Sequence, residues 1–191
     1  MIISIRGTSG SGKSTLVKSI MGLYEECEPI FIEKRKRPYY YLLRSPGQLN
    51  LAIPGHYETP CGGCDTILKV DDVFGLVERL HDEGNHVLFE GVMLCNEVNR
   101  TVRLHNGGHK VAVMCLDTSL EDCLFGINMR RVERGDWEPV NPKHTAAKHG
   151  DCVRLCERLT QAGVPFYWKS RSDAFDFVID QLKLDPAFKL L

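Results

Sequence analysis

Short apolar runs alternate with longer amphipathic stretches along most of the chain. Four apolar, often β-branched runs predict buried strands, at residues 2–5, 86–90, 110–117 and 165–170. Five stretches repeat apolar positions every three to four residues and predict helices, at about 14–25, 70–84, 119–135, 151–163 and 173–184. Apolar strands that alternate with helices are typical of a parallel sheet covered on both faces. The pattern therefore predicts one α/β domain over residues 1–191, with a doubly wound parallel sheet.

The region 28–60 departs from this alternation. Prolines and glycines interrupt its extended runs, which predicts a small β-rich insert of two or three short strands outside the main repeat. The insert concentrates cationic and aromatic side chains: Lys34, Arg35, Lys36, Arg37, Tyr39, Tyr40, Tyr41 and Arg44. Cations that contact phosphates, beside rings that stack on bases, predict a nucleic-acid contact. An edge strand kept soluble by its charges is the alternative.

Composition narrows the classes of protein. The 191 residues carry a formal net charge of -1, so attraction to nucleic acid requires a local patch. No apolar run approaches the roughly 20 residues of a membrane span, and the first residues lack a secretory signal. We therefore expect a cytoplasmic protein with no membrane contact, and we infer no obligate protein partner. The eight cysteines are then expected to be mostly buried free thiols, as at Cys95, Cys115 and Cys156.

One motif near the start of the chain predicts nucleotide binding. The sequence "GTSGSGKS" fits the pattern G-x-x-x-x-G-K-[ST], and it lies between a predicted strand and a predicted helix. Glycines let several backbone N–H groups point inward, and the helix adds its positive N-terminal end. Lys13 is expected to reach the outer phosphates of ATP, and the Ser14 hydroxyl to bind Mg²⁺. The predicted nucleotide-binding residues are Gly7, Thr8, Ser9, Gly10, Ser11, Gly12, Lys13, Ser14 and Thr15.

The remaining sequence favours a kinase over other proteins with this loop. A guanine-reading N/T-K-x-D signature is absent, and the chain is small for a motor ATPase. Glu90 ends a predicted strand, at the sheet edge where ligands bind in doubly wound folds. An acid there can hold Mg²⁺ through water or accept a proton from an attacking hydroxyl, while capping of a turn is the alternative. Asp117 ends another strand, but there Asp117 or Thr118 is expected to cap the following helix.

Arginines late in the chain predict a lid over residues 128–148. Arg130 and Arg134 are four residues apart and share one face of a predicted helix, with Arg131 beside them. Arginines on a mobile segment stabilise the charge of a transferring phosphoryl group, so Arg130 and Arg134 are predicted to be catalytic. Arg131 is predicted to bind the nucleotide. A solvated basic face at a helix C-terminus is the alternative.

The pair Cys61 and Cys64 raises the possibility of a zinc site. Zinc usually takes four ligands, and the second pair lacks the spacing of a known zinc motif. The other candidate ligands are scattered along the chain: His56, His81, His105, His109, Cys152 and Cys156. The sequence therefore leaves open whether the chain binds zinc.

The interpretation we favour for this turn involves Asp65. The two glycines before it form a tight turn that aims its carboxylate, which can accept the proton of an acceptor hydroxyl during phosphoryl transfer. Glu90 is the rival for this role, because it ends a neighbouring strand.

Four segments together resemble a known family. "GTSGSGKST", "GHYETPCGGCDTI", "VLFEG" and "NMRRVERGDWEPVNP" are similar to segments of bacteriophage P-loop kinases that phosphorylate 5-hydroxymethyluracil in DNA. The resemblance covers most of the chain, and "GHYETPCGGCD" is its discriminating part. It implies a nucleotide-kinase type of P-loop NTPase fold, with ATP and Mg²⁺ as cosubstrates, acting in the host cytoplasm on DNA before further modification of the base.

The resemblance also implies how DNA would be held. The target base would leave the helix to reach the phosphate, the segment from Lys34 to Arg44 would grip the backbone, and His56 and Tyr57 would contact the extruded base. The predicted substrate residues are Lys34, Arg35, Arg37, Tyr39, Arg44, His56 and Tyr57. Two alternatives share the P-loop: a small-molecule nucleotide or nucleoside kinase, and a nucleotide-switched binding protein.

Overall fold

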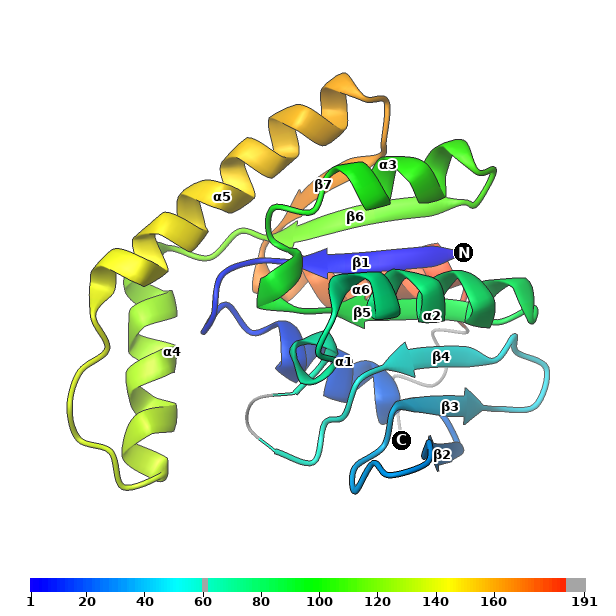
Figure 1. Ribbon diagram of the computed structural model, residues 1–191, viewed down its shortest axis with the longest axis horizontal. Coiled ribbons are helices and arrows are strands. Elements are labelled where there is room, and N and C mark those ends of the chain that lie inside the picture. Colours follow the sequence, from blue (N-terminus) through cyan, green and yellow to red (C-terminus); the bar gives the residue numbers. More distant parts are fainter. Residues whose placement is uncertain (60–61, 185–191) are drawn as a thin grey trace.

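A seven-stranded sheet forms the centre of the protein, as a computed structural model that describes residues 1–59 and 62–184 shows (Figure 1). The strand order is β2-β3-β4-β5-β1-β6-β7. The strands are β1 (Ile2–Arg6), β2 (Glu26–Ile30), β3 (Tyr40–Arg44), β4 (Leu51–Pro54), β5 (His86–Glu90), β6 (Val111–Leu116) and β7 (Phe166–Lys169). From β4 to β7 all neighbours are parallel, and β2 and β3 add antiparallel pairs at one edge. The predicted doubly wound α/β fold is confirmed.

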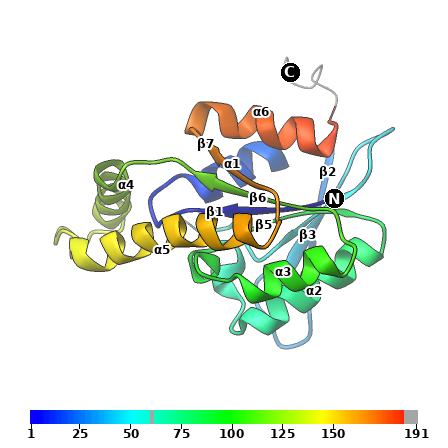
Figure 2. The ribbon, with the colours of Figure 1, turned by 90° about the horizontal axis from the view of Figure 1, so that it is seen from above.

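Helices cover both faces of this sheet (Figure 2). The first face carries α1 (Lys13–Met21) and α6 (Arg171–Leu182), and the second carries α2 (Val70–Asp82), α3 (Asn99–Asn106) and α5 (Pro142–Gln161). The remaining helix, α4 (Leu120–Glu133), stands beyond the carboxyl ends of the central strands and packs on α5. Two short 3₁₀ turns, η1 (Cys64–Thr66) and η2 (Val92–Leu94), lie at the same end. No helix among the described residues is long and apolar enough to span a membrane.

Alternation along the strands divides the core in two. On β1, Ile3 and Ile5 pack with residues of α1 and α6, whereas Ile2 packs with residues of α2 and β5. Successive side chains of a strand point to opposite faces, so one apolar run supplies both cores. A strand buried on both faces in this way reads as a continuous apolar run, which is why β1, β5 and β6 were predictable.

The β-rich region, predicted as an insert outside the strand–helix repeat, forms one edge of the main sheet. Leu51 and Ala52 of β4 pair in parallel with His86 and Val87 of β5. All four residues of β4 are buried. Burial on both faces is typical of strands inside a parallel sheet, and β4 pairs in this way with β5. The β2–β3 hairpin extends the sheet beyond β4.

Some helix boundaries differ from the prediction. The first helix ends at Met21 rather than Glu25, because the chain enters β2 at Glu26. The predicted lid, residues 128–148, also differs from the expectation. Because α5 begins at Pro142 rather than at 151, only residues 134–141 between α4 and α5 are irregular. Asn141 caps this helix by accepting a bond from the Lys143 amide (3.0 Å), and proline is well suited to the first helical position.

Two local features near the carboxyl ends of β5 and β6 also depart from the sequence expectations. Ser119, not Asp117 or Thr118, caps α4 by accepting a bond from the Asp122 amide (3.0 Å). The short helix α3 was not predicted, because only Thr101 and Leu104 of its eight residues are buried. Such a weak apolar stripe is hard to detect in sequence.

Candidate active site

The phosphate-binding loop lies between β1 and α1, as predicted. Gly10 has a φ of 82° and packs against α4 so closely that a Cβ there would lie 2.1 Å from the Cys123 carbonyl oxygen. Only glycine is therefore tolerated at this position. The Lys13 ammonium donates hydrogen bonds to the carbonyl oxygens of Gly7 (2.7 Å) and Thr8 (2.9 Å). The loop thus holds its lysine folded over the place where a phosphate would bind.

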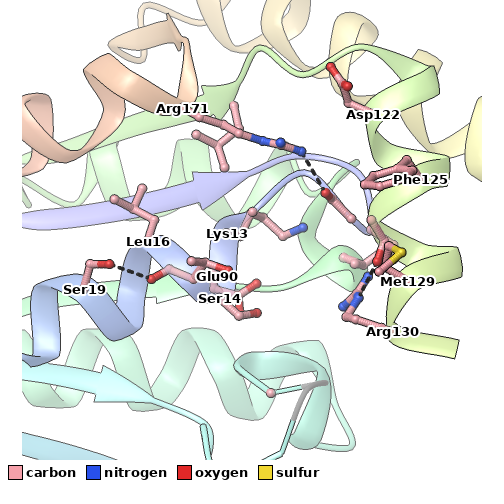
Figure 3. A pocket seen from close by; sticks show the side chains of 18 of the residues that line it. Lys13, Ser14, Leu16, Ser19, Glu90, Asp122, Phe125, Met129, Arg130 and Arg171 are labelled. Carbon is pink, nitrogen blue, oxygen red and sulfur yellow. Dashed lines mark hydrogen bonds between the residues drawn. The ribbon is translucent and has the colours of Figure 1, made fainter. Parts of the chain in front are cut away.

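Glu90 lies directly beside this loop. It ends β5, next to β1, and its side chain is 1% exposed. Its Oε1 accepts a hydrogen bond from the Ser14 hydroxyl (2.7 Å), and Figure 3 shows both residues next to Lys13. Burial raises the pKa of Glu90, against the opposing effects of Lys13 and of the bond from Ser14. The structure therefore places a buried carboxylate and a hydroxyl together at the phosphate loop.

The backbone at Gly63 also packs closely against Glu90. The Gly63 amide donates to the His56 carbonyl oxygen (2.9 Å), so the backbone of these two residues lies side by side as an isolated antiparallel bridge. Gly63 has a φ of 73°, and a Cβ there would lie 2.4 Å from Glu90 Oε1. The close approach of this backbone to the carboxylate requires glycine.

Asp65 comes soon after Gly63 in the chain and is held by backbone amides. Its two carboxylate oxygens accept bonds from the amides of Val92 (2.8 Å) and Met93 (2.9 Å), at the start of η2. The side chain is exposed and lines the same cavity as Glu90. Asp65 thus follows the glycines, lines the cavity and holds the backbone of η2, while its role as a proton acceptor stays a prediction.

Arg6 holds η2 in position through buried hydrogen bonds. Its guanidinium is fully buried and donates to the Leu94 carbonyl oxygen and to the Thr101 hydroxyl (3.1 Å). Burial lowers the pKa of Arg6 to about 10, so it stays a cation at neutral pH. Because Leu94 belongs to η2, this contact also supports the amides that hold Asp65.

A cavity of 570 Å³ joins these groups. Besides the loop, Glu90 and Asp65, it is lined from α4 by Asp122, Phe125, Met129 and Arg130 and from α6 by Arg171 and Phe175 (Figure 3). A volume of this size suits a nucleotide or a similar small molecule.

Of the three predicted lid arginines, Arg130 alone lines this cavity. Arg131 pairs with Asp136 (2.7 Å), and its Nε donates to the Glu138 carbonyl oxygen (2.7 Å). Arg134 donates to the Arg130 carbonyl oxygen (3.0 Å) at the end of α4. Side chains four residues apart share a helix face, but α4 ends between them, and only the earlier one reaches the cavity.

Arg171 is a site residue that the sequence analysis missed. It is the first residue of α6, and its guanidinium donates to the carbonyl oxygens of Ser11 (3.0 Å) and Gly10 (3.1 Å). It therefore approaches the phosphate loop from the side opposite to Arg130 (Figure 3). The signal was available, since Arg171 follows a predicted strand at the edge of the sheet where Glu90 was found.

The basic block, residues 34–37, lies in the connection from β2 to β3. The connection from β2 to β3 packs on the glycine turn and forms a hollow lined by Lys34, Arg35, Lys36, Arg37, His56 and Thr66. Arg35 donates to the Thr66 carbonyl oxygen (3.0 Å), and its guanidinium lies over the Tyr39 ring at 5.2 Å. Asp65 lines the cavity and the next residue, Thr66, lines the hollow, so the turn that carries them connects the two sites.

Other predicted substrate residues lie elsewhere. Arg44 is at the far end of β3 from the basic block and pairs with Glu28 (2.6 Å). His56 and Tyr57 are buried rather than standing at a mouth, because Tyr57 packs on Tyr41 and the His56 ring lies 3.2 Å from Arg37. Burial and Arg37 lower the pKa of His56. Their placement indicates that these two residues support the turn.

The cysteine expectations have mixed outcomes. Cys95 and Cys115 are buried free thiols as predicted, and Cys156 is half-buried. Cys61 lies outside the described residues. Cys64 is fully buried, its thiol faces the Pro54 carbonyl oxygen (3.9 Å), and burial raises its pKa well above the ordinary value. Because zinc binds the thiolate, this environment disfavours Cys64 as a ligand.

Comparisons with known proteins complete the description. No family model matches the chain. It is 46% identical over 175 residues to a protein named 5-hmdU DNA kinase from Pseudomonas phage PaMx11, covering 91% of this chain and 93% of that one. A protein of the same name from Delftia phage PhiW-14 is 23% identical over 191 residues, covering 85% and 65%.

Two solved structures of deoxyadenosine kinase from M. mycoides are also similar. One contains dCMP and dCDP, with a TM-score of 0.48 and 15% identity over 96% of this chain and 99% of that one. The other contains dATP, with a TM-score of 0.46 and 16% identity over 96% and 100%.

Proposed function

This chain belongs to the family of phage 5-hmdU DNA kinases, and we propose that it transfers the γ-phosphate of ATP to the hydroxymethyl oxygen of 5-hydroxymethyluracil in DNA. One observation carries the proposal for this chain: the phosphate loop, the buried carboxylate of Glu90 and Asp65 line one cavity, and a separate basic hollow includes Thr66, the residue that follows Asp65. The reaction forms a P–O bond to the base and breaks the bond to the leaving ADP.

ATP and Mg²⁺ would be held at the loop. Residues 7–15 provide amides for the triphosphate, and the Lys13 ammonium exchanges its two carbonyl partners for phosphate oxygens. The Ser14 hydroxyl and the Glu90 carboxylate, 2.7 Å apart, offer the hard oxygen donors that Mg²⁺ prefers. Mg²⁺ held by these two residues would neutralise charge on the phosphates. Arg171 lies where it can steady the loop itself.

Asp65 is our choice for the proton acceptor. Each of its oxygens accepts one amide bond and keeps a further lone pair, so it can still take the proton of the hydroxymethyl group. Glu90 is buried and bonded to Ser14, which suits the metal. Arg130 stabilises the charge of the transferring phosphoryl group. Roles for Arg131 and Arg134 stay predictions that depend on closure of the lid, residues 128–148.

The basic hollow is proposed to bind the DNA backbone. Lys34, Lys36 and Arg37 are exposed and lie beside the cavity, so phosphates bound there would place a neighbouring base near Asp65. A base within a duplex cannot enter a cavity of this size together with its partner, so it has to be flipped out. Arg44 lies too far along β3 to share this contact.

The test is transfer of labelled γ-phosphate to two kinds of acceptor. One is duplex DNA containing 5-hydroxymethyluracil, with unmodified DNA as the control, and the other is a panel of free nucleosides and nucleotides. The proposal expects label in the hydroxymethylated DNA alone. Label in a small molecule alone would instead favour a nucleoside or nucleotide kinase, and ATP binding without transfer would favour a nucleotide-switched binding protein.

A further inference from the structure

A cluster of histidine and acidic side chains lies at the end of the sheet opposite to the phosphate loop. His81 and Asp82 end α2, and His109 precedes β6. The end of α2 and the start of β6 lie on the side of the N-terminus, across the sheet from α4 (Figure 1). The ligand atoms of these three residues lie within 4.8 Å of one another. None of them belongs to the cavity at the phosphate loop.

The spacing of the ligand atoms fits a small tetrahedral cation. Nδ1 of His81 and Nδ1 of His109 are 3.3 Å apart. Two nitrogens bound to zinc at roughly 2.0–2.1 Å in tetrahedral geometry are about 3.4 Å apart. Asp82 Oδ1 lies 3.8 Å from the His109 nitrogen and 4.0 Å from the His81 nitrogen. Its side chain is 61% exposed, so a small rotation can bring the oxygen closer.

The opposite ring nitrogens also have partners. His109 Nε2 lies 3.6 Å from Glu78 Oε1, and His81 Nε2 lies 3.1 Å from the Met1 nitrogen. A histidine that binds a metal through Nδ1 donates its Nε2 proton to an acceptor, which fixes the orientation of the ring. Glu78 is such an acceptor for His109, and the Met1 amine is one for His81 in its uncharged form, which burial favours by lowering the pKa of that amine. The rings are held at 89° to each other, with centroids 5.1 Å apart, so both Nδ1 atoms meet at one point.

We propose that His81, His109 and Asp82 form a binding site for a divalent cation of the zinc type, with water as the fourth ligand. Two imidazoles and one carboxylate suit zinc better than magnesium, which prefers oxygen donors. The cation would join the end of α2 to the connection between α3 and β6, about 27 residues further along the chain, and would brace the sheet at this end. The alternative is a hydrogen bond between the two imidazoles without a metal.

Calorimetric titration of the metal-stripped full chain with zinc chloride tests this proposal. Excess magnesium occupies the phosphate loop, and a phosphine reductant keeps the thiols reduced. We expect one zinc per chain at micromolar or lower concentration, and a rise in melting temperature on zinc addition. His81→Asn and His109→Asn should each weaken binding by at least about tenfold. His105→Asn is the matched control, because it also removes a half-buried histidine near the end of a helix.

Two further controls keep the test decisive. Circular dichroism reports whether each variant folds, and Asp82→Asn changes an exposed side chain, so its expected loss of zinc binding does not depend on tolerance of the histidine changes. Visible absorption of the cobalt(II) form reports tetrahedral coordination, and it should vanish in His109→Asn. Absence of stoichiometric binding, or equal binding by all the variants, would overturn the proposal and leave a hydrogen-bonded histidine pair.

Discussion

Glu90 meets two opposing demands at the scale of a single residue. Its carboxylate has to be ionised to hold Mg²⁺, yet it is buried beside Ser14 and under the backbone of Gly63. Burial raises its pKa above the ordinary value of 4.5. The protein therefore keeps a group at the site that opposes its own folding at neutral pH, as buried functional groups often do.

Replacement of Glu90 separates the two demands. Because the folded-state pKa is raised, Glu90 contributes stability below its unfolded pKa and loses it as the pH rises through the folded pKa. Glu90→Gln should therefore melt at a higher temperature than the wild type at pH 7, with the difference shrinking toward pH 4. Melting curves from pH 4 to 8 without nucleotide check this, and a variant less stable at pH 7 would contradict it.

Gly63 offers a sharper test of the packing around this carboxylate. Gly63→Ala puts a Cβ 2.4 Å from Glu90 Oε1, so we expect at least about a tenfold loss of turnover and a lower melting temperature. Gly47→Ala is the matched control. Gly47 has a φ of 74°, nearly equal to the 73° of Gly63, but nothing lies within 4 Å of its Cβ position. Equal effects of the two substitutions would mean that backbone strain alone matters, and that the contact with Glu90 does not.

At the scale of elements, the place where α4 ends determines which lid arginine reaches the cavity. Arg130 lines the cavity, whereas Arg134 caps the end of the helix. We expect Arg130→Ala to lower kcat by about a hundredfold or more, because it removes charge stabilisation of the transferring phosphoryl group. Arg134→Ala should cost less than tenfold. Steady-state kinetics with saturating ATP would measure both, and a larger effect of Arg134 would indicate a closed lid that differs from this arrangement.

The connection from β2 to β3 carries the prediction about DNA. Lys34→Ala with Lys36→Ala removes two exposed cations of the hollow. The slope of log affinity against log salt for duplex DNA should fall by about 1.8, because each DNA phosphate that a lysine neutralises adds about 0.9 to that slope. The KM for ATP should stay the same.

The control for this pair removes two exposed lysines elsewhere. Lys18→Ala with Lys110→Ala leaves the hollow intact and makes the same change in net charge. If both pairs reduced the slope equally, the effect would be one of overall charge, and the hollow would not be the DNA contact.

At the scale of the whole molecule, patterns local in sequence predicted the framework. The loop at 7–15 and the strand ending at Glu90 are each specified by neighbouring residues, so their places followed from the order of strands and helices. The parallel pairing of β4 with β5 depends on residues more than 30 positions apart, and it was not predicted. Arg171 reaches the loop across 160 positions and was missed for the same reason.

Long-range packing also decided which predicted site residues meet. His56 and Tyr57 looked accessible in sequence because they follow a Pro-Gly turn, but Tyr41 and Arg37 cover them. Asp65 was expected only to face the substrate, and its bonds to the amides of η2 depend on a contact between separate segments. Local chemistry therefore identified the kinds of group at the site, while the tertiary contacts determined which of them line the cavity.

The most direct test of the central claim is the identity of the phosphorylated atom. Duplex DNA containing 5-hydroxymethyluracil is incubated with ATP, Mg²⁺ and either the wild type or Asp65→Asn, then digested to nucleosides and analysed by mass spectrometry. We expect the wild type to yield hydroxymethyluracil nucleoside heavier by one phosphoryl group on its hydroxymethyl oxygen, and Asp65→Asn to yield at least about a hundredfold less. A phosphoryl group on a DNA end or a free nucleotide, with none on the base, would contradict it.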